Sequence, residues 1–136
     1  MYGNKPETLA LLRRVQCFAL DMDGTFYLGD RLIPGALEFV QAVRQRGRRV
    51  VFLTNNSSKS AAFYQRKLAR MGLQIGPEEI LTSGQATALY LTRELPGRRV
   101  YVMGNPILKE EMAAMGVQVV EEDPDLCVIA FDTTLD

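Results

Sequence analysis

Residues 15–27, VQCFALDMDGTFY, contain an apolar run that ends at two carboxylates, Asp21 and Asp23. The run over residues 15–20 is typical of a buried strand. Because side chains alternate along an extended chain, Asp21 and Asp23 point to the same side, with Cα atoms roughly 6.5 Å apart. At an effective dielectric near 20, two such charges repel by about 2 to 3 kcal/mol. The stretch therefore predicts a strand whose carboxyl end binds a compensating cation.

The rest of the chain alternates between apolar runs and amphipathic stretches, several of which end at glycine or proline. Continuous apolar strands separated by helices are typical of parallel strands covered on both faces. We therefore predict an α/β protein with a Rossmann-like parallel sheet and helices on both faces. The further strands are expected over residues 50–53, 100–103, 117–120 and 126–131, and the helices over 34–46, 58–71, a segment carrying Ala86, Leu89 and residues 93–95, and 106–115.

Composition excludes several classes of function. Sixteen basic residues balance sixteen acidic ones without a basic tract, so we do not expect nucleic acid as a partner. The absence of histidine excludes histidine general bases, the serine and cysteine triads, and zinc sites that use histidine. Any chemistry must use carboxylates, hydroxyls, lysines or the backbone.

Cellular location is predicted from the cysteines and the apolar runs. Cys17 and Cys127 lie in apolar runs, where a thiol behaves as a small hydrophobic group, which indicates a reducing compartment. The N-terminal residues lack a signal-peptide pattern, and no apolar run approaches the ~18 residues that span a bilayer. We expect a soluble, cytoplasmic protein without a membrane partner, and a length of 136 residues fits one ordinary domain.

Mg²⁺ is the cation that best fits the carboxylate pair, because it needs few protein carboxylates when it keeps waters and phosphate oxygens. Ligands of parallel α/β sheets bind outside the carboxyl ends of the strands. An aspartate there can attack phosphorus, and a second carboxylate can transfer protons. A solvated turn, in which Asp and Gly are common, remains the alternative. An EF-hand loop is excluded, because Gly24 is fourth rather than sixth and Leu32 occupies the twelfth position.

A second polar cluster follows the next predicted strand, in VVFLTNNSSKS over residues 50–60. Its hydroxyls, amides and backbone N–H groups precede a predicted helix, where they can form a phosphate cradle. A serine-rich helix cap is the alternative. If the two strands are parallel neighbours, Thr54 lies beside Asp21 at one edge of the sheet.

DMDGT after an apolar strand, with LTNNSS after the next, resembles the first two signature motifs of the haloacid dehalogenase superfamily. FYLGDRLIPGALEFV, LTSGQATALYL, VYVMGN and VIAFDTTLD resemble its para-nitrophenyl phosphatase-like branch, which includes sugar-phosphate and nucleotide phosphatases. The resemblance implies a phosphatase with a Mg²⁺ cofactor and a small phosphorylated metabolite as substrate. It extends over nearly the whole chain from about Val15.

The resemblance also implies roles for individual residues. Asp21 is expected to be the nucleophile and a metal ligand, and Asp23 the general acid and base that also offers its backbone carbonyl to the metal. Thr54 is expected to bind the transferring phosphoryl group with help from Asn55. The segment FYLGDRL is expected to form a flap, with residues 1–80 the first part of the catalytic core and 81–136 the first part of an inserted α/β cap domain.

The family also uses a lysine and a later acidic cluster, which we expect beyond residue 136, so that the isolated chain is expected to be inactive. In the alternative, a compact capless member, Lys109, Asp132 and Asp136 fill these roles. A receiver-like phosphorylatable signalling module and a catalytically silent binding fragment are the other functions left open. Homo-oligomerisation is left open as well.

Overall fold

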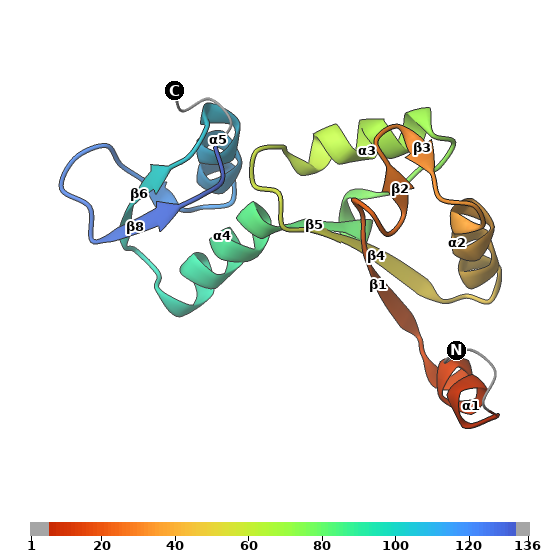
Figure 1. Ribbon diagram of the computed structural model, residues 1–136. Helices are drawn as coiled ribbons and strands as arrows, with labels where there is room; N and C mark the ends of the chain where they lie inside the picture. The colour runs from red at the N-terminus through yellow and green to blue at the C-terminus, as the bar shows by residue number, and fades with distance from the viewer. Residues whose placement is uncertain (1–5, 133–136) are drawn as a thin grey trace.

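The computed structural model describes residues 6–132, which form two parallel sheets lying side by side and connected where β5 leads into α4 (Figure 1). The first sheet has the order β1-β4-β5, with β1 at Cys17–Asp21, β4 at Arg49–Thr54 and β5 at Ile80–Thr82. The second sheet has the order β7-β6-β8, with β6 at Arg99–Met103, β7 at Gln118–Val119 and β8 at Leu126–Ile129. The predicted α/β class is confirmed.

Helices precede or separate the strands of each sheet. They are α1 (Pro6–Arg14), α2 (Ala36–Gln45), α3 (Ala61–Arg70), α4 (Ser83–Glu94) and α5 (Pro106–Ala114), with a short 3-10 helix η1 (Pro77–Glu79) and a hairpin formed by β2 (Tyr27–Leu28) and β3 (Arg31–Leu32). The helix α1, the strand β5 and η1 were not predicted. Among the described residues, no helix is both long and apolar enough to cross a membrane.

Side-chain caps set the starts of three helices. Ser60 accepts a hydrogen bond from the backbone N–H of Phe63 at the start of α3, and Thr82 accepts one from Gln85 at the start of α4. Asn105 caps α5 in the same way, with Pro106 in its first turn. Such caps satisfy backbone donors that have no partner within the helix, so local polar residues determine where these helices begin.

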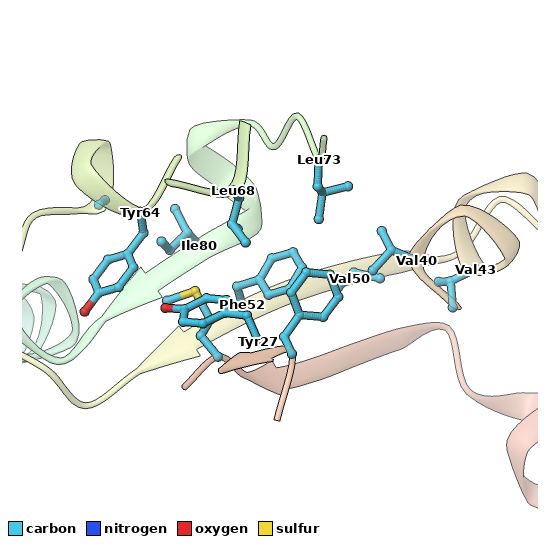
Figure 2. Packing of buried hydrophobic residues seen from close by; sticks show 12 residues of the cluster. Tyr27, Val40, Val43, Val50, Phe52, Tyr64, Leu68, Leu73 and Ile80 are labelled. Carbon is cyan, nitrogen blue, oxygen red and sulfur yellow. The ribbon is translucent and has the colours of Figure 1, made fainter. Parts of the chain in front are cut away.

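The first hydrophobic core lies between one face of the first sheet and the helices α2 and α3 (Figure 2). Phe18 pairs with Val50 and Leu20 with Phe52, so these four side chains share the covered face. The helices contribute Val40 and Val43 from α2 and Tyr64 and Leu68 from α3, all of them buried.

The opposite face of the first sheet differs from the sequence prediction. Helices were expected on both faces, but α2 and α3 both pack on the face of Val50 and Phe52. Ala19 and Leu53, on the other face, are exposed, and so is Cys17. Because α2 and α3 cover only the face of Val50 and Phe52, every second side chain of β1 is exposed. Cys127 on β8 is exposed as well, although both thiols lie in apolar runs of the sequence.

The second hydrophobic core lies between the second sheet and the helices α4 and α5. The buried stripe of α4 is Gly84, Ala88 and Leu91, whereas Ala86 is exposed. Gly84 permits this orientation, because a Cβ atom there would lie 2.5 Å from Cδ1 of Leu108 on α5. The close crossing of the two helices therefore decides which side of α4 is buried.

Candidate active site

The carboxylates of Asp21 and Asp23 are exposed at the end of β1, on either side of the fully buried Met22. After Asp23 the chain turns at Gly24, whose φ of +81° favours glycine. The carbonyl oxygen of Met22 accepts backbone hydrogen bonds from the turn that follows. The alternation expected of Asp21 and Asp23 is therefore observed, and a tight turn holds the second carboxylate.

Each carboxylate accepts a hydrogen bond from a hydroxyl of the following turn. The hydroxyl of Thr25 donates to Oδ2 of Asp21 over 3.2 Å, and that of Tyr27 donates to Oδ2 of Asp23 over 3.3 Å. Tyr27 lies in the expected flap, the β2–β3 hairpin, and its side chain is fully buried. Burial, and after it the negative charge of Asp23, raises the pKa of Tyr27. Its hydroxyl therefore stays protonated and acts as a donor to Asp23.

Lys67 of α3 places a positive charge close to this turn. Its Nζ lies 4.1 Å from the centroid of the Tyr27 ring, a distance that allows a cation–π interaction. The contact links α3 to the β2–β3 hairpin, and the residue was not singled out by sequence analysis.

The polar residues after β4 adjoin the end of β1. Asp21 pairs with Leu53, so Thr54 is the next residue along β4. Thr54 is buried, and its Oγ1 accepts a hydrogen bond of 3.2 Å from the backbone N–H of Asn56. Asn55 is exposed. The structure thus places Asp21 and Asp23 at the same edge of the sheet as Thr54 and Asn55.

Tyr64 of α3 lies against the residues that follow β4. Its buried hydroxyl interacts with the side chains of Thr54 and Asn56. Burial is the largest effect and raises the pKa of Tyr64, whereas those two hydrogen bonds act in the opposite direction. Tyr64 therefore remains neutral near physiological pH. Tyr64 lies within the helix predicted over residues 58–71, but its polar contacts do not follow from the helical pattern.

The β4–α3 loop, residues 55–60, corrects one feature of the predicted phosphate cradle. The helix was expected from residue 58, but α3 begins at Ala61. Its first amide is occupied, because the N–H of Ala61 donates to Oε1 of Glu111 on α5 over 3.2 Å. Ser58 N–H is also occupied, by Oδ1 of Asn56. The first amide of α3 and the N–H of Ser58 are therefore not available to a ligand in this conformation.

The donor set at this edge fits a hard cation. Within residues 6–132 no group of three or more His, Cys, Asp or Glu side chains could hold a metal ion by itself. The exposed carboxylates of Asp21 and Asp23 are hard oxygen donors, and so is the backbone carbonyl of Asp23, which accepts no hydrogen bond in the described part of the chain. Mg²⁺ is commonly bound by one or two carboxylates, with waters and phosphate oxygens completing its shell.

Lys109, the lysine of the compact alternative, is paired with a residue outside this edge. Lys109 lies on α5, where its Nζ forms a 2.8 Å ion pair with Glu121. Both residues belong to the second unit, which comprises the second sheet with α4 and α5 (residues 83–132). This partner raises the pKa of Lys109. Asp132 is half-buried beyond the end of β8, and Asp136 lies outside the described residues.

A cavity of about 250 Å³ lies between the β4–α3 loop and the second unit. Asn55 and Ser57 line it from the loop, and Ser83 and Thr87 line it from α4; its apolar wall includes Leu108, Met112, Val128 and Phe131. A larger pocket of about 300 Å³ lies among α1, β1 and α2 and contains none of the candidate site residues. The smaller cavity is the one that adjoins the polar edge.

Known proteins resemble this chain in sequence and in fold. A family model described as haloacid dehalogenase-like hydrolase matches residues 18–118. Glycerol-3-phosphate phosphatase of Mus musculus is 40% identical over 124 residues, which cover 85% of this chain and 39% of that protein.

Two solved structures are also similar. The 4-nitrophenylphosphatase of Thermotoga maritima has a TM-score of 0.87 at 43% identity, covering 93% of this chain and 48% of that one. Glycerol phosphate phosphatase of Mycobacterium tuberculosis, solved in complex with magnesium, has a TM-score of 0.77 at 34% identity, covering 91% of this chain and 38% of that one. The chain spans less than half the length of each of these relatives.

Proposed function

The chain belongs to the haloacid dehalogenase-like hydrolases, and on that premise we propose that it acts in a magnesium-dependent phosphatase that hydrolyses small phosphomonoesters through an aspartyl phosphate. The observation that carries the proposal is the pairing of Asp21 with Leu53. This pairing supports a single site composed of the two carboxylates after β1 and of Thr54 and Asn55 after β4.

In the proposed reaction, a carboxylate oxygen of Asp21 attacks phosphorus and the ester P–O bond breaks. Asp23 gives a proton to the leaving alcohol oxygen. Asp23 then takes a proton from a water molecule, whose oxygen attacks the same phosphorus and releases inorganic phosphate and free Asp21. One residue thus acts as acid and then as base, because the proton that it gives in the first step is regained in the second.

The exposed oxygens of Asp21, with the free backbone carbonyl of Asp23, would hold the Mg²⁺ ion. When bound, the ion offsets the charge of the phosphoryl oxygens and of Asp21. The hydrogen bond from Thr25 orients the carboxylate of Asp21, and the bond from Tyr27 orients that of Asp23. These contacts restrict both carboxylates before substrate binds.

Thr54 and Asn55 are proposed to bind the transferring phosphoryl group. The cavity beside Asn55, with its mixture of hydroxyl and apolar side chains, is suited to the alcohol part of a small phosphorylated metabolite. The relatives are named for glycerol phosphates and 4-nitrophenyl phosphate, so these esters are the first substrates to test.

We also propose that residues 1–80 are part of the catalytic core and residues 81–136 part of a cap that selects the substrate. Separate hydrophobic clusters, one reaching Ile80 and the other beginning at Ala88, support this division. The free thiols of Cys17 and Cys127 fit a cytoplasmic, reducing location.

The test is a phosphate-release assay with these esters, in Mg²⁺ and in EDTA, on the full-length protein that contains this chain, as wild type and as Asp21→Asn. We expect release that requires both Mg²⁺ and Asp21. A phosphorylated Asp21 that forms but does not turn over would favour the receiver-like module instead. If neither the phosphorylated residue nor release is detected, the binding fragment is favoured.

A further inference from the structure

Asn105 connects the second unit to the β4–α3 loop. Its side chain is buried, with 6% of its surface exposed. Its Oδ1 accepts a 3.0 Å hydrogen bond from the N–H of Leu108, which caps α5, and its Nδ2 donates a 2.9 Å hydrogen bond to the carbonyl oxygen of Ser58. Both ends of the amide are therefore used, and only one of its two bonds serves α5.

The contact at Ser58 continues along the loop to Thr54. Ser58 is buried, and both its N–H and its hydroxyl donate to Oδ1 of Asn56, over 2.9 and 2.7 Å. The N–H of Asn56 in turn donates to Oγ1 of Thr54 over 3.2 Å. A continuous series of hydrogen bonds thus connects Asn105, in the second unit, with Thr54.

Other hydrogen bonds to the same loop come from the second unit. Ser83 donates from its hydroxyl to the carbonyl oxygen of Asn55 over 3.1 Å. The N–H of Phe131 donates to Oγ of Ser57 over 2.9 Å. These bonds are exposed, whereas the bond between Asn105 and Ser58 is buried. Because a buried hydrogen bond does not exchange readily with water, Asn105 is expected to restrain the loop most strongly.

We propose that Asn105 is a positioning residue that holds the β4–α3 loop, through Ser58 and Asn56, in the conformation that binds a phosphoryl group at Thr54 and Asn55. The second unit then sets the phosphate affinity of the site, besides lining the adjoining cavity. This inference rests on the proposed function for its ligand, but the restraint of the loop can be measured without any ligand.

The two bonds of Asn105 can be separated by substitution. Asn105→Asp keeps an oxygen acceptor for Leu108 N–H and so keeps the cap, but it removes the donor to Ser58. Asn105→Ser also keeps a capping oxygen and adds no charge. Lys109→Ala is the matched control, because it changes the same helix at an exposed ion pair that does not touch the loop.

The first measurement is amide hydrogen exchange of residues 54–58, followed by mass spectrometry on the 136-residue chain, together with the Tm of each variant. We expect exchange at least about tenfold faster in Asn105→Asp and in Asn105→Ser than in the wild type and in Lys109→Ala. Wild-type exchange rates in both variants, or faster exchange that merely follows a lower Tm across the whole chain, would overturn the proposal.

The second measurement is the Kd of inorganic phosphate in Mg²⁺, by calorimetry on the full-length protein that contains this chain. We expect the Kd to be about tenfold higher in both Asn105 variants and unchanged in Lys109→Ala. An unchanged Kd in the Asn105 variants would overturn the proposal that Asn105 affects phosphate binding. If no protein, including the wild type, binds phosphate while exchange still accelerates in the Asn105 variants, the restraint of the loop is supported and the proposed function fails.

Discussion

Asp21 and Leu53 are the last paired residues between β1 and β4, and Thr54 follows Leu53 directly. Parallel strands that end in register place the residues that follow them at one edge of a sheet. The pairing therefore brings together two polar clusters that are separated along the sequence by the β2–β3 hairpin, α2 and β4.

Thr54 is predicted to contribute its hydroxyl to phosphoryl binding. Thr54→Val keeps the shape of the side chain but removes the hydroxyl, and we expect KM to rise about 10- to 100-fold, the range for a lost hydrogen bond to a charged group. Thr54→Ser keeps the hydroxyl and is the control. Steady-state kinetics with glycerol 3-phosphate measure both, and equal KM values for the two variants would refute the role of the hydroxyl.

Asp23 is predicted to protonate the leaving group. Asp23→Asn should slow the release of glycerol from glycerol 3-phosphate about a hundredfold or more, because an alkoxide is a poor leaving group. Hydrolysis of 4-nitrophenyl phosphate should slow much less, since nitrophenolate leaves without protonation. Rates of phosphate release for both esters give the comparison. Equal losses for the two would indicate that Asp23 has a structural role only.

Tyr27 is predicted to make the free energy of unfolding depend on pH in the alkaline range. Burial, and next the charge of Asp23, raises its pKa above the ordinary value of 10.0, so the folded protein keeps the hydroxyl protonated where the unfolded chain ionises. The free energy of unfolding should therefore fall as pH rises above 10, by up to about 1.4 kcal/mol per pH unit from this residue. In Tyr27→Phe the fall should be shallower. Urea unfolding at several pH values tests this, and identical slopes would contradict it.

Much of the fold could be predicted from sequence because its signals are local. The apolar run before Asp21 predicts β1, and the run over residues 50–53 predicts β4. The class α/β follows from their alternation with helices. The strand β5 was missed because it has only three residues, Ile80–Thr82, which form a strand through pairing with β4 rather than through a pattern of their own.

The candidate site could be predicted only in part. The motifs containing Asp21 and Thr54 are visible because each follows a strand directly. The contact between Asn105 and Ser58 joins residues 47 positions apart, and no periodicity relates them. Asn105 is recognisable in the sequence as a helix cap before Pro106, but its second bond depends on how the two units pack. Contacts of this kind require a structure.

Phe52 is predicted to be the most sensitive position of the first core. It is fully buried within the cluster of Figure 2. Its ring packs edge to face on Phe26, with centroids 4.9 Å apart. Phe52→Ala should lower the free energy of unfolding by about 3 to 5 kcal/mol. Leu53→Ala, on the exposed face of the same strand, is the control and should cost less than about 1 kcal/mol. Denaturant unfolding measures both losses of free energy, and similar losses in the two variants would refute this packing.

The central claim is that Asp21 is the nucleophile, and trapping of the acyl phosphate tests it most directly. The protein is mixed with 4-nitrophenyl phosphate and Mg²⁺, quenched, and treated with borohydride, which reduces an aspartyl phosphate to homoserine. Peptide mass spectrometry should find homoserine at position 21 in the wild type and none in Asp21→Asn, whose turnover should fall at least about a thousandfold. Homoserine at another aspartate, or undiminished turnover in Asp21→Asn, would contradict the claim.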